Sequence, residues 1–280
     1  MFKISKGLGN VAESTLRFFA QIGVEEVSIP SRLNDNLQLR PLVPSPQLKA
    51  PGPLPAMWDE AELQRIAERV RAFDLNPTLM DLPLSGRILL GLEGRDEDLR
   101  DVEMRVQMAA RVGIGVLTYN FTALRASEGY AACEGTGRGG AHLRDFDFAR
   151  IEGLPPLEDV GQHSQEQMWE RLTLFLRAIV PVAERAGLRL ALHPNDPPVP
   201  VYRGVGQPLW NLDSMKRLVD VIDSRANSVF FDTGVTTEYG EDAAEAIRYF
   251  GRRDRIGTVH FRNVQVEEPY YRYTETFVDE

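Results

Sequence analysis

Cysteine and histidine are scarce in this sequence of 280 residues, which contains one Cys and four His. Cys133 has no partner for an intramolecular disulfide, and a cysteine-rich zinc site is excluded. No run of about 18 apolar residues occurs, and the N-terminus lacks the pattern of a signal peptide. We therefore predict a soluble, cytoplasmic protein with no membrane segment.

Positive charge is also in deficit, with 32 Lys and Arg against 41 Asp and Glu and a net charge of −9. Nucleic-acid binding is disfavoured, because neutralising phosphates requires clustered basic residues. Individual arginines remain available for a small anionic substrate. The hydrophobic fraction of 43% is that of an ordinary globular protein, long enough for one large α/β barrel or two smaller domains.

Short apolar runs alternate with helical patterns along the chain. The runs predict strands at residues 2–4, 26–29, 77–82, 114–121, 188–193, 229–232 and 256–261. Apolar spacings of three and four predict helices at residues 14–22, 59–73, 96–112, 165–186, 213–222 and 242–250. This alternation indicates a parallel sheet, and polar residues at strand ends favour a closed barrel over a doubly wound sheet. We predict a single α/β domain over residues 1–280, a (β/α)8 TIM barrel that lacks its last β/α unit.

Two long segments interrupt the alternation. Residues 30–58 are rich in proline, and residues 122–164 contain a glycine-rich run at 135–140. Both follow strands at the expected active-site face, so they are candidate lids or rim segments, with insertions of no function as the alternative. The glycine-rich run is not a phosphate loop, because it lacks the Gly-Lys-Ser/Thr ending.

Three polar residues end three consecutive predicted strands: His193, Asp232 and His260. Neighbouring parallel strands lie about 5 Å apart, so side chains at their carboxyl ends converge over the barrel mouth. Two imidazoles and a carboxylate are a good ligand set for Mn²⁺, Fe²⁺ or Zn²⁺. Taken singly, each histidine is more typical of a structural role, and an Asp before Thr-Gly is typical of a helix cap. The coincidence on three strand ends favours a metal site.

Other polar residues surround this predicted centre. Arg262 follows the second of these histidines by two residues and is predicted to clamp a substrate carboxylate, with a surface salt bridge as the alternative. Tyr119 and Asn120 end the fourth strand, where they would bind hydroxyls or relay a proton, although a tyrosine there serves equally as core filler. Asn195 and Asp196 lie in a proline-rich turn, where they would contact substrate or orient the preceding histidine.

Several stretches resemble, in order, those of the mannonate dehydratase family. The most specific are residues 193–198 (His-Pro-Asn-Asp-Pro-Pro) and 259–264 (Val-His-Phe-Arg-Asn-Val). Residues 88–96, 118–121 and 138–141 also match, so the resemblance covers nearly the whole chain.

The resemblance implies a TIM barrel of the xylose-isomerase-like superfamily, with Mn²⁺ or Fe²⁺ as cofactor and a homodimeric assembly. The implied activity is that of a hydro-lyase in hexuronate catabolism, which removes water from D-mannonate to give 2-keto-3-deoxy-D-gluconate. By motif match, His193 and His260 would be metal ligands and Arg262 a catalytic substrate contact that stabilises the enediolate. Tyr119 is a candidate for the general base or the general acid.

The sequence departs from the family pattern in two places. Many members carry Cys at the end of the sixth strand, where this chain has Asp232, a harder ligand that favours Mn²⁺ or Mg²⁺. The family's eighth strand supplies a further metal ligand and a catalytic His in a Pro-Asp-His motif, and this sequence ends at Glu280 before that motif.

Three alternative functions remain open from the sequence. A metal-dependent sugar isomerase or epimerase on the same barrel is favoured by Asp232 and opposed by His193, because such enzymes usually place Glu there. A non-catalytic barrel that binds a ligand or assembles with itself fits the missing eighth strand. The apurinic-site endonuclease branch of the superfamily is disfavoured by the acidic charge and the few histidines.

Overall fold

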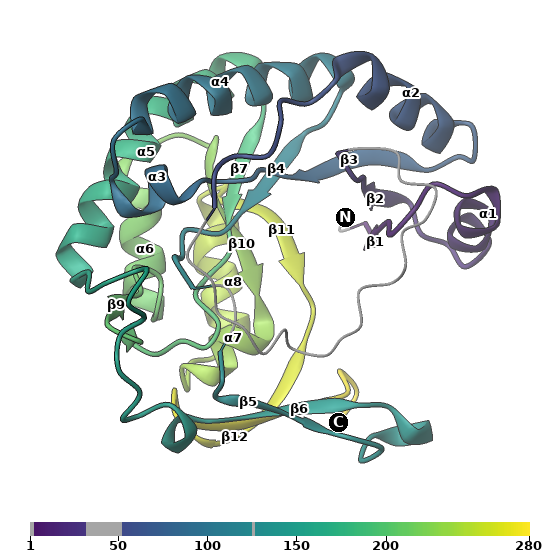
Figure 1. Cartoon of the computed structure of the whole chain (residues 1–280). Helices are drawn as coiled ribbons and strands as arrows, with labels where there is room; N and C mark the ends of the chain where they lie inside the picture. The colour runs from purple at the N-terminus through teal and green to yellow at the C-terminus, as the bar shows by residue number, and fades with distance from the viewer. Residues whose placement is uncertain (1–2, 32–51, 125–126) are drawn as a thin grey trace.

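Seven parallel strands form the main sheet of the computed structural model, which describes residues 3–31, 52–124 and 127–280 (Figure 1). Each neighbouring pair of strands is parallel. In sheet order the strands are β1 (Ser5–Gly7), β2 (Glu26–Ser28), β3 (Asn76–Asp81), β4 (Val116–Tyr119), β7 (Arg189–Leu192), β10 (Asn227–Asp232) and β11 (Ile256–His260).

The sheet curls strongly, as in a barrel. A Cβ placed on Gly257 of β11 would lie 2.7 Å from the Cβ of Ala191 in β7 and 3.4 Å from Cγ1 of Val116 in β4. Those strands are two and three places away along the sheet, so β11 bends over them and glycine allows the close approach. No described ladder joins the two end strands, β1 and β11. The predicted α/β barrel is confirmed as an incomplete barrel of seven described strands.

Helices pack around the outer face of the curled sheet (Figure 1). The longest, α5, begins with a capping box at Ser164, whose hydroxyl accepts from the Gln167 amide, and ends at Gly187 with φ of 74°. Its bounds agree with the prediction, because both end signals are local in sequence. The helices are α1 (Glu13–Gln21), α2 (Glu60–Arg71), α3 (Gly86–Leu90), α4 (Arg95–Val112), α5 (Gln165–Ala186), α6 (Leu212–Val221), α7 (Thr233–Glu238) and α8 (Ala243–Arg252).

A second sheet lies beyond the carboxyl end of β11, at the bottom of Figure 1. It is antiparallel, in the order β12 (Asn263–Glu268), β13 (Arg272–Thr276), β6 (Leu143–Asp147) and β5 (Tyr130–Cys133). The rim segment after β4 therefore contains a strand pair, and a hairpin after β11 completes the sheet. We refer to it as the rim sheet. The sequence prediction missed these strands; the pairing of β13 with β6, which unites the two hairpins into one sheet, joins segments more than a hundred residues apart.

Other elements also differ from the sequence prediction. The first strand is Ser5–Gly7 instead of 2–4; it is an exposed end strand, which apolar content does not mark. The short helices α3 and α7 and the two-residue strands β8 (Val201–Tyr202) and β9 (Val205–Gly206) were not predicted. Residues 32–51 of the predicted proline-rich rim segment lie outside the described residues. Within the described residues, no helix combines the length and apolarity needed to span a bilayer.

Candidate metal centre

Three strand ends bring His193, Asp232 and His260 together. His193 follows β7 directly, and Asp232 and His260 are register partners at the ends of β10 and β11. Asp232 Oδ2 lies 3.4 Å from His193 Nε2 and 3.2 Å from His260 Nδ1, and these two nitrogens are 3.3 Å apart. Each residue thus turns one potential ligand atom toward a common point.

The imidazole of His193 is oriented by its own backbone neighbourhood. Its Nδ1 lies 2.7 Å from the Pro194 carbonyl oxygen, which only accepts hydrogen bonds, so Nδ1 carries the proton. Nε2 is then the atom directed at the cluster: it donates to Asp232 when the ring is protonated, and it would be free to bind a metal ion in the neutral ring. The contact of Nδ1 with a backbone carbonyl is the usual second contact of a metal-ligating histidine. The ring packs edge-on against Phe230, with centroids 4.9 Å apart.

Asp232 has two roles, because its two carboxylate oxygens face different partners. Oδ1 accepts from the Val235 amide at 2.8 Å and caps α7, while Oδ2 faces both imidazoles. The side chain is only 2% exposed. Burial favours the neutral acid, but hydrogen bonds from His193 and His260 outweigh it and lower the pKa of Asp232 far below its usual range. The helix-cap interpretation and the ligand interpretation of this residue are therefore compatible.

The spacing of the three atoms fits a divalent metal ion. Ligand atoms about 2.0–2.2 Å from a metal, at angles of tetrahedral or octahedral coordination, lie about 3.0–3.5 Å from one another. The three observed separations of 3.2–3.4 Å fall in that range. Two nitrogens and one ionised oxygen suit Mn²⁺, Fe²⁺ or Zn²⁺, so the residues present can hold such an ion.

Arg262 lies beside this cluster but is surrounded by protein carboxylates. Its Nη1 is 3.3 Å from both Asp196 Oδ2 and Glu275 Oε1, and its Nη2 donates to Glu238 Oε1 at 2.5 Å. Its Nε faces Asp232 Oδ1 at 3.4 Å. A bidentate clamp on a substrate would displace at least one of these partners. In this structure Arg262 binds protein carboxylates, because four of them converge on its guanidinium, and its contact with substrate stays a prediction.

Asn195 and Asp196 are engaged within the protein. Asn195 is buried, and its Oδ1 accepts from the Leu209 amide at 2.8 Å, which holds two loop segments together. Asp196 accepts from the hydroxyl of Tyr130 and from Arg262. These contacts favour positioning roles over the predicted substrate contacts, and neither side chain has a described hydrogen bond to His193.

Tyr119 and Asn120 lie at the end of β4 and differ in burial. The Tyr119 ring packs against Phe175 of α5, with centroids 5.3 Å apart, so it faces the helix layer. Its hydroxyl is buried and has no hydrogen-bond partner among the described residues, and burial raises its pKa. The core-filler alternative describes this placement, and the predicted proton-transfer role of Tyr119 is not supported by it. Asn120, the residue after β4, is half-buried.

The sequence analysis missed four residues that surround Arg262 and the turn after β7. They are Glu238 at the end of α7, Tyr130 on β5, and Tyr273 and Glu275 on β13. The Tyr130 and Tyr273 hydroxyls are 2.7 Å apart, and Glu275 also pairs with Arg144 of β6 at 2.5 Å. Nothing in their local sequence distinguishes them from surface residues, since only the packing of α7 and the rim sheet at the mouth brings them there.

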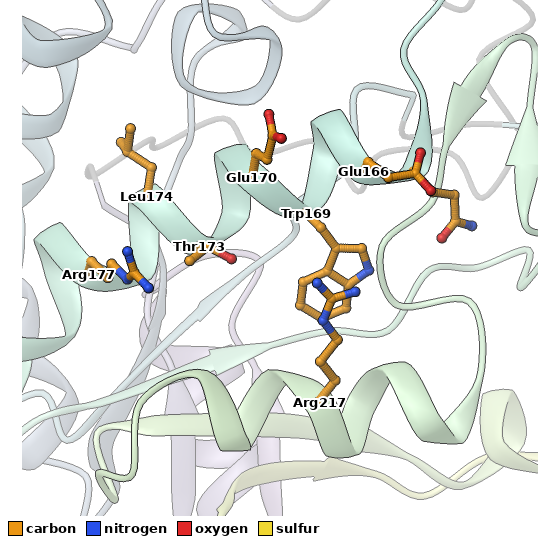
Figure 2. Close-up of a pocket in the computed structure, with 8 residues that line it drawn as sticks. Glu166, Trp169, Glu170, Thr173, Leu174, Arg177 and Arg217 are labelled. Carbon is orange, nitrogen blue, oxygen red and sulfur yellow. The ribbon is translucent and has the colours of Figure 1, made fainter.

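A separate surface pocket of about 600 Å³ lies between α5 and α6 (Figure 2). The Arg217 guanidinium lies over the Trp169 ring there, 4.0 Å from its centroid. The pocket shares no residue with the metal cluster, because its lining comes from the outer helix layer: Gln165, Glu166, Trp169, Glu170, Thr173, Leu174, Arg177 and Arg217.

The fold and the cluster define an α/β barrel with a candidate metal centre at the carboxyl ends of its strands. Comparison with known proteins narrows this class. The D-mannonate dehydratase (UxuA) family model matches residues 148–279. Mannonate dehydratases of Streptococcus agalactiae and Thermotoga maritima are both 26% identical, over 76% and 78% of this chain and 68% and 70% of their own lengths. These matches confirm the predicted resemblance to the mannonate dehydratase family.

Solved structures show the same architecture. A mannonate dehydratase from Streptococcus suis superposes with a TM-score of 0.80 at 22% identity, covering 98% of this chain and 75% of that one. D-psicose 3-epimerase from Clostridium cellulolyticum superposes with a TM-score of 0.58 at 12% identity, over 92% of this chain and 72% of the epimerase. At these identities the superpositions establish the barrel fold alone.

Proposed function

We propose that this protein is a metal-dependent hydro-lyase that removes water from a sugar acid, D-mannonate, to give 2-keto-3-deoxy-D-gluconate. The observation that carries the proposal is the convergence of His193, Asp232 and His260 at strand ends, in a chain similar to mannonate dehydratases. Within the same cluster Asp232 favours the isomerase or epimerase alternative and His193 opposes it.

The proposed role of each residue follows from the geometry of the site. His193 Nε2, Asp232 Oδ2 and His260 Nδ1 would hold Mn²⁺ or Fe²⁺. The ion would supply a Lewis acid for the substrate carboxylate and its 2-hydroxyl, which acidifies the C2 proton. Asp232 is ionised even before an ion binds, because hydrogen bonds from the two imidazoles lower its pKa, so its negative charge is available to a cation. Asn120 is proposed to donate to a substrate hydroxyl.

The cellular location, the oligomeric state and the pathway are inferred from the family resemblance. We infer a cytoplasmic homodimer that acts in hexuronate catabolism. The dimer can be checked by light scattering of the purified protein.

The first test is product formation from D-mannonate by the full gene product loaded with Mn²⁺. We expect 2-keto-3-deoxygluconate to accumulate, to disappear after treatment with EDTA and to return when Mn²⁺ is added, because the cluster has no substitute for the cation. Product that is insensitive to EDTA would contradict the metal role. A protein that holds stoichiometric metal and forms no product would contradict the choice of substrate, and an isomerised sugar would instead favour the epimerase alternative.

The placement of Tyr119 leads to a second prediction in the same assay. Tyr119→Phe is expected to leave the turnover of D-mannonate unchanged, because the hydroxyl is buried against the helix layer. The free energy of unfolding should stay the same or rise by up to about 1–2 kcal/mol, since an unpaired buried hydroxyl is removed. A folded variant with a loss of turnover of about 100-fold would instead support a proton-transfer role.

A further inference from the structure

The guanidinium of Arg262 packs against the first turn of α7. A Cβ placed on Gly234 would lie 2.4 Å from Arg262 Nε and 3.1 Å from its Cζ. Only glycine therefore lets the arginine lie against this turn. The turn begins at Asp232, the helix cap and proposed metal ligand, so the position of Arg262 and that of Asp232 are mechanically connected.

Glu238, at the other end of α7, is the most buried carboxylate around this arginine. Its side chain is 0% exposed, against 20% for Asp196 and 19% for Glu275. Its Oε1 accepts from Nη2 at 2.5 Å, whereas the carboxylates on Nη1 are both at 3.3 Å. Of the three contacts, the one with Glu238 is thus the shortest that holds the guanidinium against α7.

A buried ion pair is a weak source of stability, because desolvation offsets most of its attraction. Its geometric consequence here is specific. With Arg262 held, Nε faces Asp232 Oδ1, and the Val235 amide binds the same oxygen. Oδ1 accepts from the Val235 amide and lies 3.4 Å from Nε, a charge contact without a hydrogen bond, so Oδ2 is left to face the two imidazoles.

We propose that Glu238 is a positioning residue of the metal centre: it holds Arg262 against α7 and thereby fixes the carboxylate of Asp232 toward the metal. This inference rests on the metal centre of the proposed function and assigns a role to a residue outside the ligand set. It also gives Arg262 a positioning role in place of the predicted clamp on substrate.

The test compares Glu238→Leu, which removes the acceptor, with Glu238→Gln, which keeps one. Titration calorimetry with Mn²⁺ gives the affinity, and the visible absorption of the Co²⁺-loaded protein reports ligand geometry. We expect Glu238→Leu to weaken Mn²⁺ binding by about 10- to 100-fold and to change the Co²⁺ spectrum, as loss of an outer contact of a metal ligand does. Glu238→Gln should retain most of the wild-type Mn²⁺ affinity and of the wild-type Co²⁺ spectrum.

Asp98→Leu is the matched control, because Asp98 is a buried carboxylate bound to Ser85 between α3 and α4, outside the metal centre. It should leave the affinity and the spectrum unchanged. If Glu238→Leu fails to fold, Gly234→Ala tests the proposal in its place, because its added Cβ forces Arg262 to move while every carboxylate remains. It should weaken Mn²⁺ binding in the same way.

A folded Glu238→Leu or Gly234→Ala variant with the wild-type Mn²⁺ affinity and Co²⁺ spectrum would overturn the proposal. A wild-type protein that binds no divalent metal would overturn the metal centre and this inference together. If metal binding responds to the variants as expected but D-mannonate is not dehydrated, the proposed substrate fails and the positioning role stands.

Discussion

Replacing His193 with alanine is expected to weaken Mn²⁺ binding by more than about 100-fold and to reduce the dehydration of D-mannonate to background. Loss of an outer contact of a ligand already costs about 10- to 100-fold in affinity, and His193 is proposed as a ligand itself. Its Nε2 lies 3.3–3.4 Å from the other two ligand atoms, and no other described residue places a His, Cys or carboxylate atom within that cluster. Titration calorimetry and the product assay measure the two effects.

The matched control for this prediction is His142→Ala. His142 is exposed and lies between β5 and β6, in the rim segment, so its removal should leave metal affinity and turnover unchanged. Circular dichroism of both variants in EDTA checks that the barrel is retained. Wild-type Mn²⁺ affinity in the His193→Ala protein would refute the metal centre as described.

Phe175→Ala is expected to lower the free energy of unfolding by about 3–5 kcal/mol, the usual cost of truncating a fully buried phenylalanine. Phe175 is 0% exposed on α5 and touches Tyr119 and Phe121, with ring centroids 5.3 and 5.9 Å away. The cavity left behind would separate the longest helix from the strand that precedes the rim segment. Urea denaturation followed by circular dichroism measures the loss.

An exposed phenylalanine on α1 provides the comparison. Phe18 is 54% exposed, so Phe18→Ala should cost less than about 1 kcal/mol. An equal loss in the two variants would mean that Phe175 is not part of the packed core that joins α5 to the sheet.

Asp232 shows why a departure from the family pattern is compatible with the same fold. The position needs one atom facing the imidazoles, which either a thiolate or a carboxylate provides. A carboxylate also has a second oxygen, and here that oxygen caps α7 and faces Arg262. The second oxygen of Asp232 thus links the cap of α7 to Arg262.

Much of the barrel was predictable because its signals are local. The strands that are buried on both faces appear as apolar runs, and α5 carries both its capping box and its terminal glycine within the sequence. The end strand β1 was misplaced because its side chains are exposed and carry no apolar signal. The rim sheet was missed because β13 pairs with β6 across about half the chain, and no local pattern encodes that pairing.

The candidate metal centre was predictable for a related reason. Parallel strands place their carboxyl ends at one edge, so polar residues at consecutive strand ends must converge once the fold class is known. This applies to His193, Asp232 and His260. It does not apply to Glu238 and Glu275, whose distance from Arg262 depends on how α7 and the rim sheet pack on the barrel.

Short-range periodicity and strand order in the sequence are enough to predict the parallel barrel, its longest helix and the convergence of His193, Asp232 and His260. Only the tertiary structure decided the environment of those three residues. It placed the Tyr119 ring in the core instead of the mouth, and it surrounded Arg262 with four carboxylates from three separate segments. The physical reason is that side-chain burial and ion pairing depend on contacts between segments distant in sequence, which a pattern along one chain does not record.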